Sequence, residues 1–504
     1  MRKRTLVTAI AVASASLMGG LAPAAVASPD KPGSGTTRPA KADSDFNGDG
    51  YGDLVANIPT TKTDGAQNAG TVVVLYGSAQ GVAKRQLITQ NTPGIPGASE
   101  AYDNFGGQAV AGDFDGDGYA DLAIGADGED LTVNGDYRRN AGQITLVWGG
   151  KHGLARHGAT TVRQTEPTDL DWRRGSALAA GDFNHDGKAD LATGDQSPGR
   201  GGEVLYGPIS RTGKPKSTVN LGIKDAKAQV DIGLETADVT GDRVSDLVIQ
   251  VSRIRFPATD RFEIHKGTKK GLLRTGSLTD AQGKPLTGDE GNDPVAVGDL
   301  DRDGHADIAV GLLGRDGGSP PRYAGSVTLV YGGPKGQSDR SVQVITQDTP
   351  GVPDESEEDD FFGNSVAIGD TNGDGYGDLA VGASRETFGQ VGAAGQVTVL
   401  PGGPQGVTGA GSRVYHQDTE GVPGTVSESA AFGSAVKLTD LNGDKRADLA
   451  VGGIGYRATP SRVTVLPADR TSGAITGTGS KSVTYTDLGL PHDGWTGFGG
   501  YFGR

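Results

Sequence analysis

The segment DFNGDGYGD, residues 45–53, decides how this sequence folds, because it returns six more times along the chain. The later copies are DFDGDGYAD from Asp113, DFNHDGKAD from Asp182, DVTGDRVSD from Asp238, DLDRDGHAD from Asp299, DTNGDGYGD from Asp370 and DLNGDKRAD from Asp440. Each copy continues directly into an apolar run such as DLVANI or DLAVGA, which indicates a turn that leads into a β-strand. Seven copies at intervals of 56 to 71 residues indicate a repeated supersecondary unit.

Each unit contains further strand-like runs and a recurring connection to the next unit. A second apolar run follows a variable excursion, as in residues 70–76, and a third follows it, as in RQLITQ. A Gln-x-Thr turn is then followed after 15 residues by Phe-Gly, from Gln90 to Phe105, from Gln347 to Phe362 and from Gln417 to Phe432. Four short antiparallel strands in each of seven units predict an all-β protein, a seven-bladed β-propeller.

The two ends of the sequence predict how the chain is organised. Residues 1–27 combine a basic start, an apolar stretch and small residues before Ser28, which is typical of a signal peptide. We expect residues 28–42 to be a flexible linker and residues 43–504 to be the propeller. The first unit lacks a strand before Asp45, so we expect the C-terminal segment, about residues 495–504, to complete the first blade and remove an open edge. The alternative is a frayed tail.

The repeated loops have the composition of a calcium site, since calcium takes six to eight oxygen ligands in a tolerant geometry. Carboxylate or amide side chains stand at loop positions 1, 3, 5 and 9, a backbone carbonyl is available at position 7, and glycine at position 6 permits a positive φ. The predicted metal ligands are Asp45, Asn47, Asp49, Tyr51, Asp53, Asp113, Asp115, Asp117, Tyr119, Asp121, Asp182, Asn184, Asp186, Lys188, Asp190, Asp299, Asp301, Asp303, His305, Asp307, Asp370, Asn372, Asp374, Tyr376, Asp378, Asp440, Asn442, Asp444, Arg446 and Asp448.

The loops are not expected to bind equally well. Solvated Asx turns would use the same residue types without a metal, but the repeated offsets favour a metal site. An EF-hand is excluded, because an EF-hand needs a bidentate glutamate at position 12 and the first loop of this chain has Ala56 there. The loop from Asp440 has Lys445 where glycine belongs. The loop from Asp238 has Thr240 and Arg243 at positions 3 and 6, so this second loop should bind calcium weakly or not at all. We therefore expect about five or six calcium ions.

The order of these motifs resembles the FG-GAP repeats at the head of integrin α chains, and exported FG-GAP proteins of actinomycetes. Phe-Gly, the acidic loop, an apolar strand and an Ala-Gly pair recur in one order over roughly residues 43–504, with Ala-Gly at residues 69–70, 141–142, 324–325 and 394–395. The resemblance implies a seven-bladed propeller with calcium in its loops and, by analogy, cell adhesion. The third to fifth units depart from it at Arg174-Gly175, Asp231 and Asn292, where Phe-Gly is expected.

Composition limits the function. A net charge of −15 argues against nucleic acid as a partner, and the absence of cysteine excludes disulfides. No segment after the signal peptide is apolar enough to span a membrane. We therefore expect a secreted, extracellular monomer whose propeller binds a protein or a glycan of unknown identity.

Two alternative functions stay open. A secreted hydrolase or lyase would need its site on the propeller face, because no separate catalytic domain and no GxSxG or HExxH motif is present, so we assign no catalytic residues. Propellers of this kind nevertheless accompany a phospholipase, esterases and polysaccharide lyases. The other alternative is a structural, calcium-dependent extracellular component. Residues 172–174 and 253–256 are candidate ligand contacts or ordinary blade-edge residues, and the acidic run 354–360 indicates a solvated loop.

Overall fold

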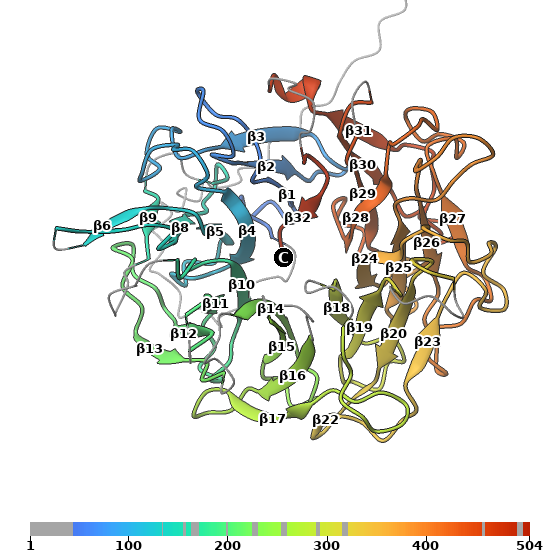
Figure 1. Ribbon diagram of the computed structural model, residues 1–504, viewed down its shortest axis with the longest axis horizontal. Helices are drawn as coiled ribbons and strands as arrows, with labels where there is room; N and C mark the ends of the chain where they lie inside the picture. Colours follow the sequence, from blue (N-terminus) through green and yellow to red (C-terminus); the bar gives the residue numbers. More distant parts are fainter. Residues whose placement is uncertain are drawn as a thin grey trace, which may run out of the picture. The chain divides into compact units, whose positions relative to one another are not determined.

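Seven four-stranded antiparallel sheets make up the described part of the chain, and Figure 1 shows them around one centre, with one edge strand of each sheet innermost. This computed structural model describes residues 44–133, 135–154, 158–162, 171–197, 200–223, 230–253, 260–288, 293–314, 321–455, 459–490 and 497–504. They belong to a compact unit, Pro39–Arg504. The predicted signal peptide and linker lie outside the described residues. The sheets are the predicted seven blades, so the all-β propeller is confirmed.

The first four blades have the following strands. Blade 1 contains β32 (Tyr501–Phe502), β1 (Leu54–Ile58), β2 (Thr71–Tyr76) and β3 (Lys84–Ile88). Blade 2 contains β4 (Phe105–Gly112), β5 (Asp121–Ala126), β8 (Gln143–Val147) and β9 (Thr160–Thr161), with the hairpin β6 (Leu131–Val133) and β7 (Asp136–Arg138) inserted. Blade 3 contains β10 (Ala177–Gly181), β11 (Asp190–Gly194), β12 (Gly202–Tyr206) and β13 (Ser217–Asn220). Blade 4 contains β14 (Val230–Ala237), β15 (Asp246–Arg253), β16 (Arg261–Lys266) and β17 (Leu273–Ser277).

The last three blades repeat this pattern. Blade 5 contains β18 (Val295–Gly298), β19 (Asp307–Leu312), β20 (Ser326–Val330) and β23 (Gln343–Ile345), with the short hairpin β21 (Gly332–Gly333) and β22 (Gly336–Gln337). Blade 6 contains β24 (Phe362–Gly369), β25 (Asp378–Ala383), β26 (Gln396–Leu400) and β27 (Arg413–Tyr415). Blade 7 contains β28 (Phe432–Thr439), β29 (Asp448–Gly453), β30 (Arg462–Leu466) and β31 (Lys481–Thr484), followed by the short 3-10 helix η1 (Thr486–Leu488).

The hydrophobic core lies between the blades, because each sheet packs on a neighbour on both faces. The middle strands are accordingly apolar and buried throughout, as in β2 and β25. Outer strands such as β13 are largely exposed. Among the described residues the buried side chains form seven clusters, one at each junction between neighbouring blades. Stability is therefore distributed around the ring.

The Phe-Gly and Ala-Gly motifs are the two halves of one connection between blades. The N–H of Phe105 donates to the carbonyl of Ala69 in the preceding blade at 3.1 Å, and Phe362 and Phe432 do the same with Ala324 and Ala394. Gly70 has a φ of 92°, and a Cβ there would lie 2.1 Å from the carbonyl oxygen of Phe105. Glycine is therefore required by both the backbone conformation and the close approach of the neighbouring blade.

The ring is completed by the C-terminal segment. Strand β32 pairs with β1, with Tyr501 opposite Asn57, and Figure 1 shows the C-terminus at the centre of the ring. Arg504 then reaches across to blade 4, where its Nε lies 2.9 Å from the carboxylate of Glu235. Its guanidinium also donates to the carbonyl of Leu234, and Lys437 of blade 7 donates to the carbonyl of Gly503. These contacts to two other blades, 4 and 7, hold this segment in place. Residues 495–496 of the predicted segment lie outside the described residues.

Candidate metal-binding loops

The aspartate at position 1 closes every acidic loop by accepting hydrogen bonds from N–H groups further along the loop. In blade 1 the carboxylate of Asp45 accepts from Gly48 at 2.7 Å and from Gly50 at 2.9 Å. The corresponding acceptors in blades 2 to 7 are Asp113, Asp182, Asp238, Asp299, Asp370 and Asp440. One side chain therefore curls each loop into a tight turn.

Two positions in each loop adopt the left-handed backbone conformation. Position 6 does so in all seven loops, as its glycines predicted, with a φ of 92° at Gly50 and of 66° and 69° at Arg243 and Lys445. Position 4 does so as well, even where it is His185 or Arg302. Position 4 was not expected to do so, although glycine occupies it in five of the seven copies. The loop therefore turns twice.

The aspartate at position 9 is buried and ties its loop to the end of the next hairpin. In blade 1, Asp53 accepts from the N–H of Phe46 at 3.0 Å and from the N–H of Gly77, just after β2, at 2.9 Å. Equivalent pairs of backbone donors reach Asp121, Asp190, Asp246, Asp307, Asp378 and Asp448. A predicted ligand is therefore also a structural tie, which sequence spacing did not indicate.

The carboxyl groups at position 9 have raised pKa values. Burial raises the pKa of Asp53 to about 7 and that of Asp121 to about 8, with the neighbouring loop carboxylates raising both pKa values further and the backbone hydrogen bonds lowering them. The pKa values of Asp190 and Asp307 are likewise raised to about 7, and that of Asp448 to about 6, mainly by burial. A nearby cation would lower these pKa values, because an opposite charge favours the ionised carboxylate.

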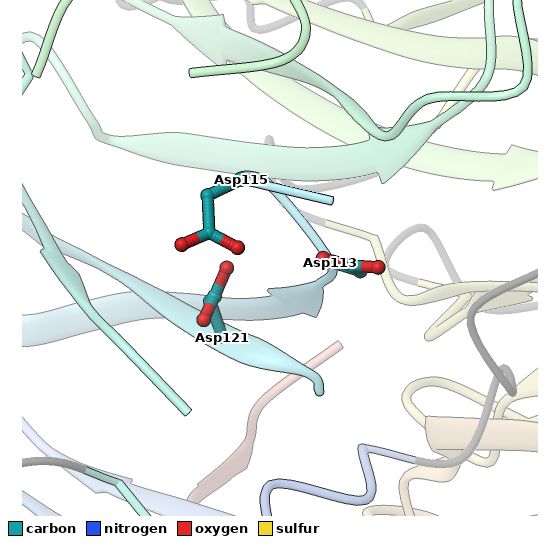
Figure 2. A group of neighbouring side chains, drawn as sticks. All are labelled: Asp113, Asp115 and Asp121. Atoms are coloured by element: carbon teal, nitrogen blue, oxygen red, sulfur yellow. The ribbon is translucent and has the colours of Figure 1, made fainter. Parts of the chain in front are cut away.

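Positions 1, 3 and 9 converge most clearly in blade 2. Figure 2 shows the carboxylates of Asp115 and Asp121 turned toward one another, with Asp113 beside them, and their ligand oxygens lie within 4.8 Å of one another. In blade 5 the converging residues are Asp299, Asp301 and Asp303. Carboxylate oxygens at this spacing are the donors that a hard divalent cation prefers.

Four other loops offer an amide at position 3. These amides belong to Asn47, Asn184, Asn372 and Asn442. The Oδ1 of Asn184 is buried and has no hydrogen-bond partner, which is what a metal ligand would show in the absence of its ion. The amide of Asn442 instead donates to Asp448 at 2.9 Å, so it lies against position 9. The donor sets thus fit a divalent cation. The loop of blade 7 fits least well, because its position 3 amide is already hydrogen-bonded to position 9.

Position 5 fixes the backbone at position 7, whose carbonyl is the remaining predicted ligand. Asp49 accepts from the N–H of Tyr51 at 3.1 Å. The same bond joins Asp117 to Tyr119, Asp186 to Lys188, Asp303 to His305, Asp374 to Tyr376 and Asp444 to Arg446. The blade 4 loop keeps it as well, between Asp242 and Val244, despite Thr240 at position 3. The two turns of the loop are therefore retained even where the ligand set is incomplete.

The loops follow one another around the ring as an acidic belt. The N–H at position 8 of one loop donates to the position 1 carbonyl of the preceding loop, from Ala120 to Asp45 at 3.2 Å and, closing the ring, from Gly52 to Asp440 at 3.0 Å. In the described residues, six of the seven junctions have this bond; the other four join Ser245 to Asp182, Ala306 to Asp238, Gly377 to Asp299 and Ala447 to Asp370. Neighbouring loops are therefore in direct contact at these six junctions.

Basic side chains from outside the loops pair with five of them. Arg211 contacts Asp115 at 2.6 Å and Asp117 at 2.9 Å in blade 2. The other pairs are Lys216 with Asp186, Lys266 with Asp242, Arg340 with Asp301 and Arg470 with Asp444. Among the described residues, the aspartates of the blade 1 and blade 6 loops have no such ion pair. Sequence spacing did not indicate these partners, because they come from the third strand of a blade or from the connection between its third and fourth strands.

The other candidate residues lie elsewhere. Arg174 is 3% exposed and pairs with Glu203 at 2.8 Å, so it is not a surface contact. Arg173 pairs with Asp127 at 2.8 Å and belongs to the blade edge. Residues 254–256 of the second candidate lie outside the described residues. The acidic run 354–360 is only partly solvated, because Asp360 is 2% exposed. Among the residues described, no helix is long and apolar enough to cross a bilayer.

Comparisons with known proteins identify the repeat. A family model described as FG-GAP repeat matches residues 105–147, 174–205 and 362–400, which fall on blades 2, 3 and 6. A phosphatidylinositol-glycan-specific phospholipase D from Bos taurus is 30% identical over 166 residues, covering 32% of this chain and 19% of that protein. Integrin alpha-5 from Xenopus laevis is 28% identical over 230 residues, covering 44% of this chain and 21% of that protein.

A second integrin shows the same likeness over a shorter stretch. Integrin alpha-PS2 from Drosophila melanogaster is 40% identical over 85 residues, covering 16% of this chain and 6% of that protein. The chain spans about a fifth of the length of the phospholipase and of integrin alpha-5. With matched repeats on three blades, partial likeness to integrin α chains and seven blades in one ring, the chain contains FG-GAP repeats in an integrin-like β-propeller.

Proposed function

We propose that this protein is an exported FG-GAP propeller whose acidic belt holds calcium and whose opposite face binds an extracellular protein or glycan. The observation that carries the proposal is the belt itself, in which loops of one geometry, rich in carboxylates, are joined edge to edge by hydrogen bonds. The activity of the bovine phospholipase is not assigned to this chain, because the match spans 19% of that protein.

Calcium is the cation that this donor chemistry favours. Every predicted ligand atom is an oxygen, from a carboxylate, an amide or a backbone carbonyl. The predicted ligand atoms include no cysteine sulfur and no histidine ring nitrogen. Calcium accepts six to eight such oxygens in flexible geometry, and extracellular concentrations fill even sites with Kd values near 10⁻³ M. The residues that would hold it are those at positions 1, 3, 5, 7 and 9 of the loops in blades 1, 2, 3, 5, 6 and 7.

Bound calcium would brace the ring. It would neutralise the carboxylates within each loop, and the hydrogen bonds between loops would pass the ordering to the neighbouring blades. The propeller could then present the other face as a rigid surface. Binding to the folded state stabilises it by about 2.7 kcal/mol per site when free calcium is 100 times Kd.

The face opposite the belt is the one we assign to ligand binding. Antiparallel order places the β1–β2, β3–β4 and β5–β8 connections at the strand ends opposite the loops. Two large aromatic side chains are exposed there, Tyr102 at 57% and Tyr137 at 62%. Figure 1 shows the β6–β7 hairpin, which carries Tyr137, projecting outward from blade 2. Exposed tyrosines on a rigid support are typical of protein and sugar contacts.

Thermal unfolding of residues 28–504 in chelator and across a calcium titration tests the metal part, with bound ions counted by native mass spectrometry. We expect the melting temperature to rise with calcium and about five or six ions to bind. An unchanged melting temperature together with no bound calcium would refute it.

A glycan array probed with the calcium-loaded protein tests the ligand part. We expect retention on a subset of glycans that is reduced when both Tyr102 and Tyr137 are replaced by alanine. Retention that is unaffected by this double substitution would place the ligand site elsewhere.

A further inference from the structure

In blade 6, two side-chain amides hold carboxylate groups on the face opposite the belt. Gln347 follows β23, and Gln396 is the first residue of β26. The Nε2 atoms of both glutamines donate to the carboxylate of Glu386, at 2.8 and 3.3 Å, and both also donate to Asp354. The connections that carry these residues run at the strand ends opposite the belt loop from Asp370. The pair of amides therefore forms a site that carboxylates of this chain fill.

Blade 2 has the same pair of amides with one carboxylate. Gln90 follows β3, and Gln143 is the first residue of β8. The Nε2 of Gln90 donates to Glu129 at 2.6 Å. Gly97 takes the place of Asp354 in sequence, and a Cβ on this glycine would lie 3.1 Å from the Nε2 of Gln90 and 3.8 Å from that of Gln143. The two amides therefore converge on one place, as they do in blade 6.

Blade 7 keeps this convergence but changes one of the two donors. Gln417 follows β27 and is 2% exposed, and the first residue of β30 is Arg462. A Cβ on Gly424 would lie 2.4 Å from the Nη1 of Arg462 and 3.6 Å from the Nε2 of Gln417. Where blades 2 and 6 have a glutamate, the sequence of blade 7 has Tyr456, which lies outside the described residues. A guanidinium and an amide therefore converge where two amides meet a glutamate in the other blades.

The guanidinium of Arg462 lacks a counter-charge among the described residues. Its Nε is buried and has no hydrogen-bond partner, and its Nη1 donates to the carbonyl of Pro423 at 3.4 Å. Burial lowers the pKa of Arg462, and no described carboxylate forms an ion pair with it. An arginine in a protein stays charged, and a buried charge is normally paired. The arrangement therefore fits an anion that accepts hydrogen bonds from this side chain.

An anion can reach these donors from the surface. Arg462 is half-buried, and Gly424, against which its Nη1 lies, is exposed. A carboxylate matches the donors, because a guanidinium presents parallel N–H groups to two oxygens. Carboxylates also fill the same place in blades 2 and 6, where they stand at the ends of the flexible side chains of Glu129 and Glu386. The framework therefore favours a glutamate side chain over a carboxylate fixed to a ring.

We propose that Arg462 and Gln417 bind the carboxylate of a glutamate side chain from an extracellular protein partner. The guanidinium supplies the charge and the amide supplies a second donor. The site lies on the face to which we assigned ligand binding, so the inference rests on that proposal and specifies one group of the ligand. Because the chain has a net charge of −15, attraction of an anion is confined to short range, which favours a single carboxylate over a polyanion.

Nuclear magnetic resonance of the full chain with isotope-labelled arginine tests the proposal, because the Nε–H of Arg462 reports directly on the site. Its resonance is identified by its loss in Arg462→Gln, which gives blade 7 the residue type that blades 2 and 6 have there. We expect the resonance to shift on titration with N-acetylglutamate N-methylamide, whose one carboxylate is that of the side chain. N-acetylglutamine N-methylamide is the matched neutral control and should leave it unchanged. Equal responses to the two probes, or no response to either, would overturn the site.

Gln417→Leu tests the second donor and keeps the reporting atom of Arg462. Loss of one hydrogen bond should raise the probe concentration at half-maximal shift about fivefold. An unchanged concentration would contradict the assignment of Gln417. Glucuronate, whose carboxylate is attached to a sugar ring, is titrated in parallel, and a stronger response to it than to the glutamate probe would overturn the assignment to a protein side chain.

Failure of this site and failure of the proposed ligand-binding face have different results. If the Arg462 resonance responds to the glutamate probe but the Tyr102 and Tyr137 double substitution leaves glycan retention unchanged, the tyrosine assignment fails and this site stands. If the double substitution reduces retention but the resonance does not respond, this site alone fails.

Discussion

The loops of blades 2 and 5 differ from those of blades 1 and 6 in two residues that offset each other. Blades 2 and 5 have aspartate at position 3, Asp115 and Asp301, and each of these carboxylates is met by an arginine, Arg211 or Arg340. Blades 1 and 6 have asparagine at position 3 and, in the described residues, no ion pair to their aspartates. When only the carboxylates at positions 1, 3, 5 and 9, taken as ionised, and the basic side chains paired with them are counted, both kinds of loop have a balance of −3.

The remaining loops carry less negative charge. On the same count, blades 3, 4 and 7 have three carboxylates each and one paired basic side chain, Lys216, Lys266 or Arg470, which leaves a balance of −2. Because a divalent cation is held mainly by charge and oxygen donors, we expect the loops of blades 1, 2, 5 and 6 to bind calcium more strongly than the other three. The charge of each loop, counted together with its paired basic side chain, is therefore the property to change by mutation.

The largest effect is expected from removing position 1 in a strong and in a weak loop. Asp370→Ala should lose both a bound ion and the hydrogen bonds to Gly373 and Gly375, whereas Asp238→Ala should lose only hydrogen bonds. At calcium 100 times Kd, the free energy of unfolding should fall by about 2.7 kcal/mol more in Asp370→Ala. Denaturant unfolding with and without chelator measures this, and equal losses in calcium would contradict the division.

A compensating pair in blade 2 sharpens the charge argument. Asp115→Asn should weaken calcium binding by this loop about tenfold, because Arg211 then leaves a net charge of −2. The double variant Asp115→Asn with Arg211→Met returns the loop to −3 and should restore most of the affinity. Calorimetric titration of both variants checks this. If the double variant binds as weakly as the single one, net charge does not set affinity.

Backbone strain should give a smaller effect. Lys445 and Arg243 adopt φ values of 69° and 66°, a region that costs a side chain roughly 1 kcal/mol or more relative to glycine. Lys445→Gly and Arg243→Gly should therefore raise the free energy of unfolding in chelator by about 1 kcal/mol each. Gly375→Lys is the reciprocal control and should lower it. Destabilisation by both glycine variants would show that these side chains contribute more than their strain costs.

The smallest effect is expected at Lys216. Its side chain is 60% exposed, and its pair with Asp186 is a surface ion pair. Lys216→Met should therefore change the free energy of unfolding by less than about 1 kcal/mol. It should also move blade 3 toward the strong loops in calcium affinity, because the net charge becomes −3. Native mass spectrometry at limiting calcium measures the change, and an unchanged affinity would contradict it.

Much of this could be read from the sequence because it repeats. The spacing of the acidic segments predicted the blades, and the glycines at position 6 predicted the left-handed turn that Gly50 adopts. Residues that act through packing between repeats were not predictable in this way. Arg211 lies 96 residues from Asp115, and no spacing rule joins them. Burial of Asp360 was missed for a related reason, since acidic residues are usually exposed and their sequence does not show what packs over them.

Closure by β32 also constrains the order in which the protein can form. Residue 501 pairs with residue 57, so blade 1 stays incomplete until nearly the whole propeller has been synthesised. Bringing such distant segments together costs on the order of 5 kcal/mol of chain entropy, and contacts of this kind slow folding. Meanwhile β1 keeps an open edge that another strand could occupy. The risk that another strand pairs with β1 therefore lasts until late in folding. The ion pair of Arg504 with Glu235 is among the contacts that hold β32 in place and remove this risk.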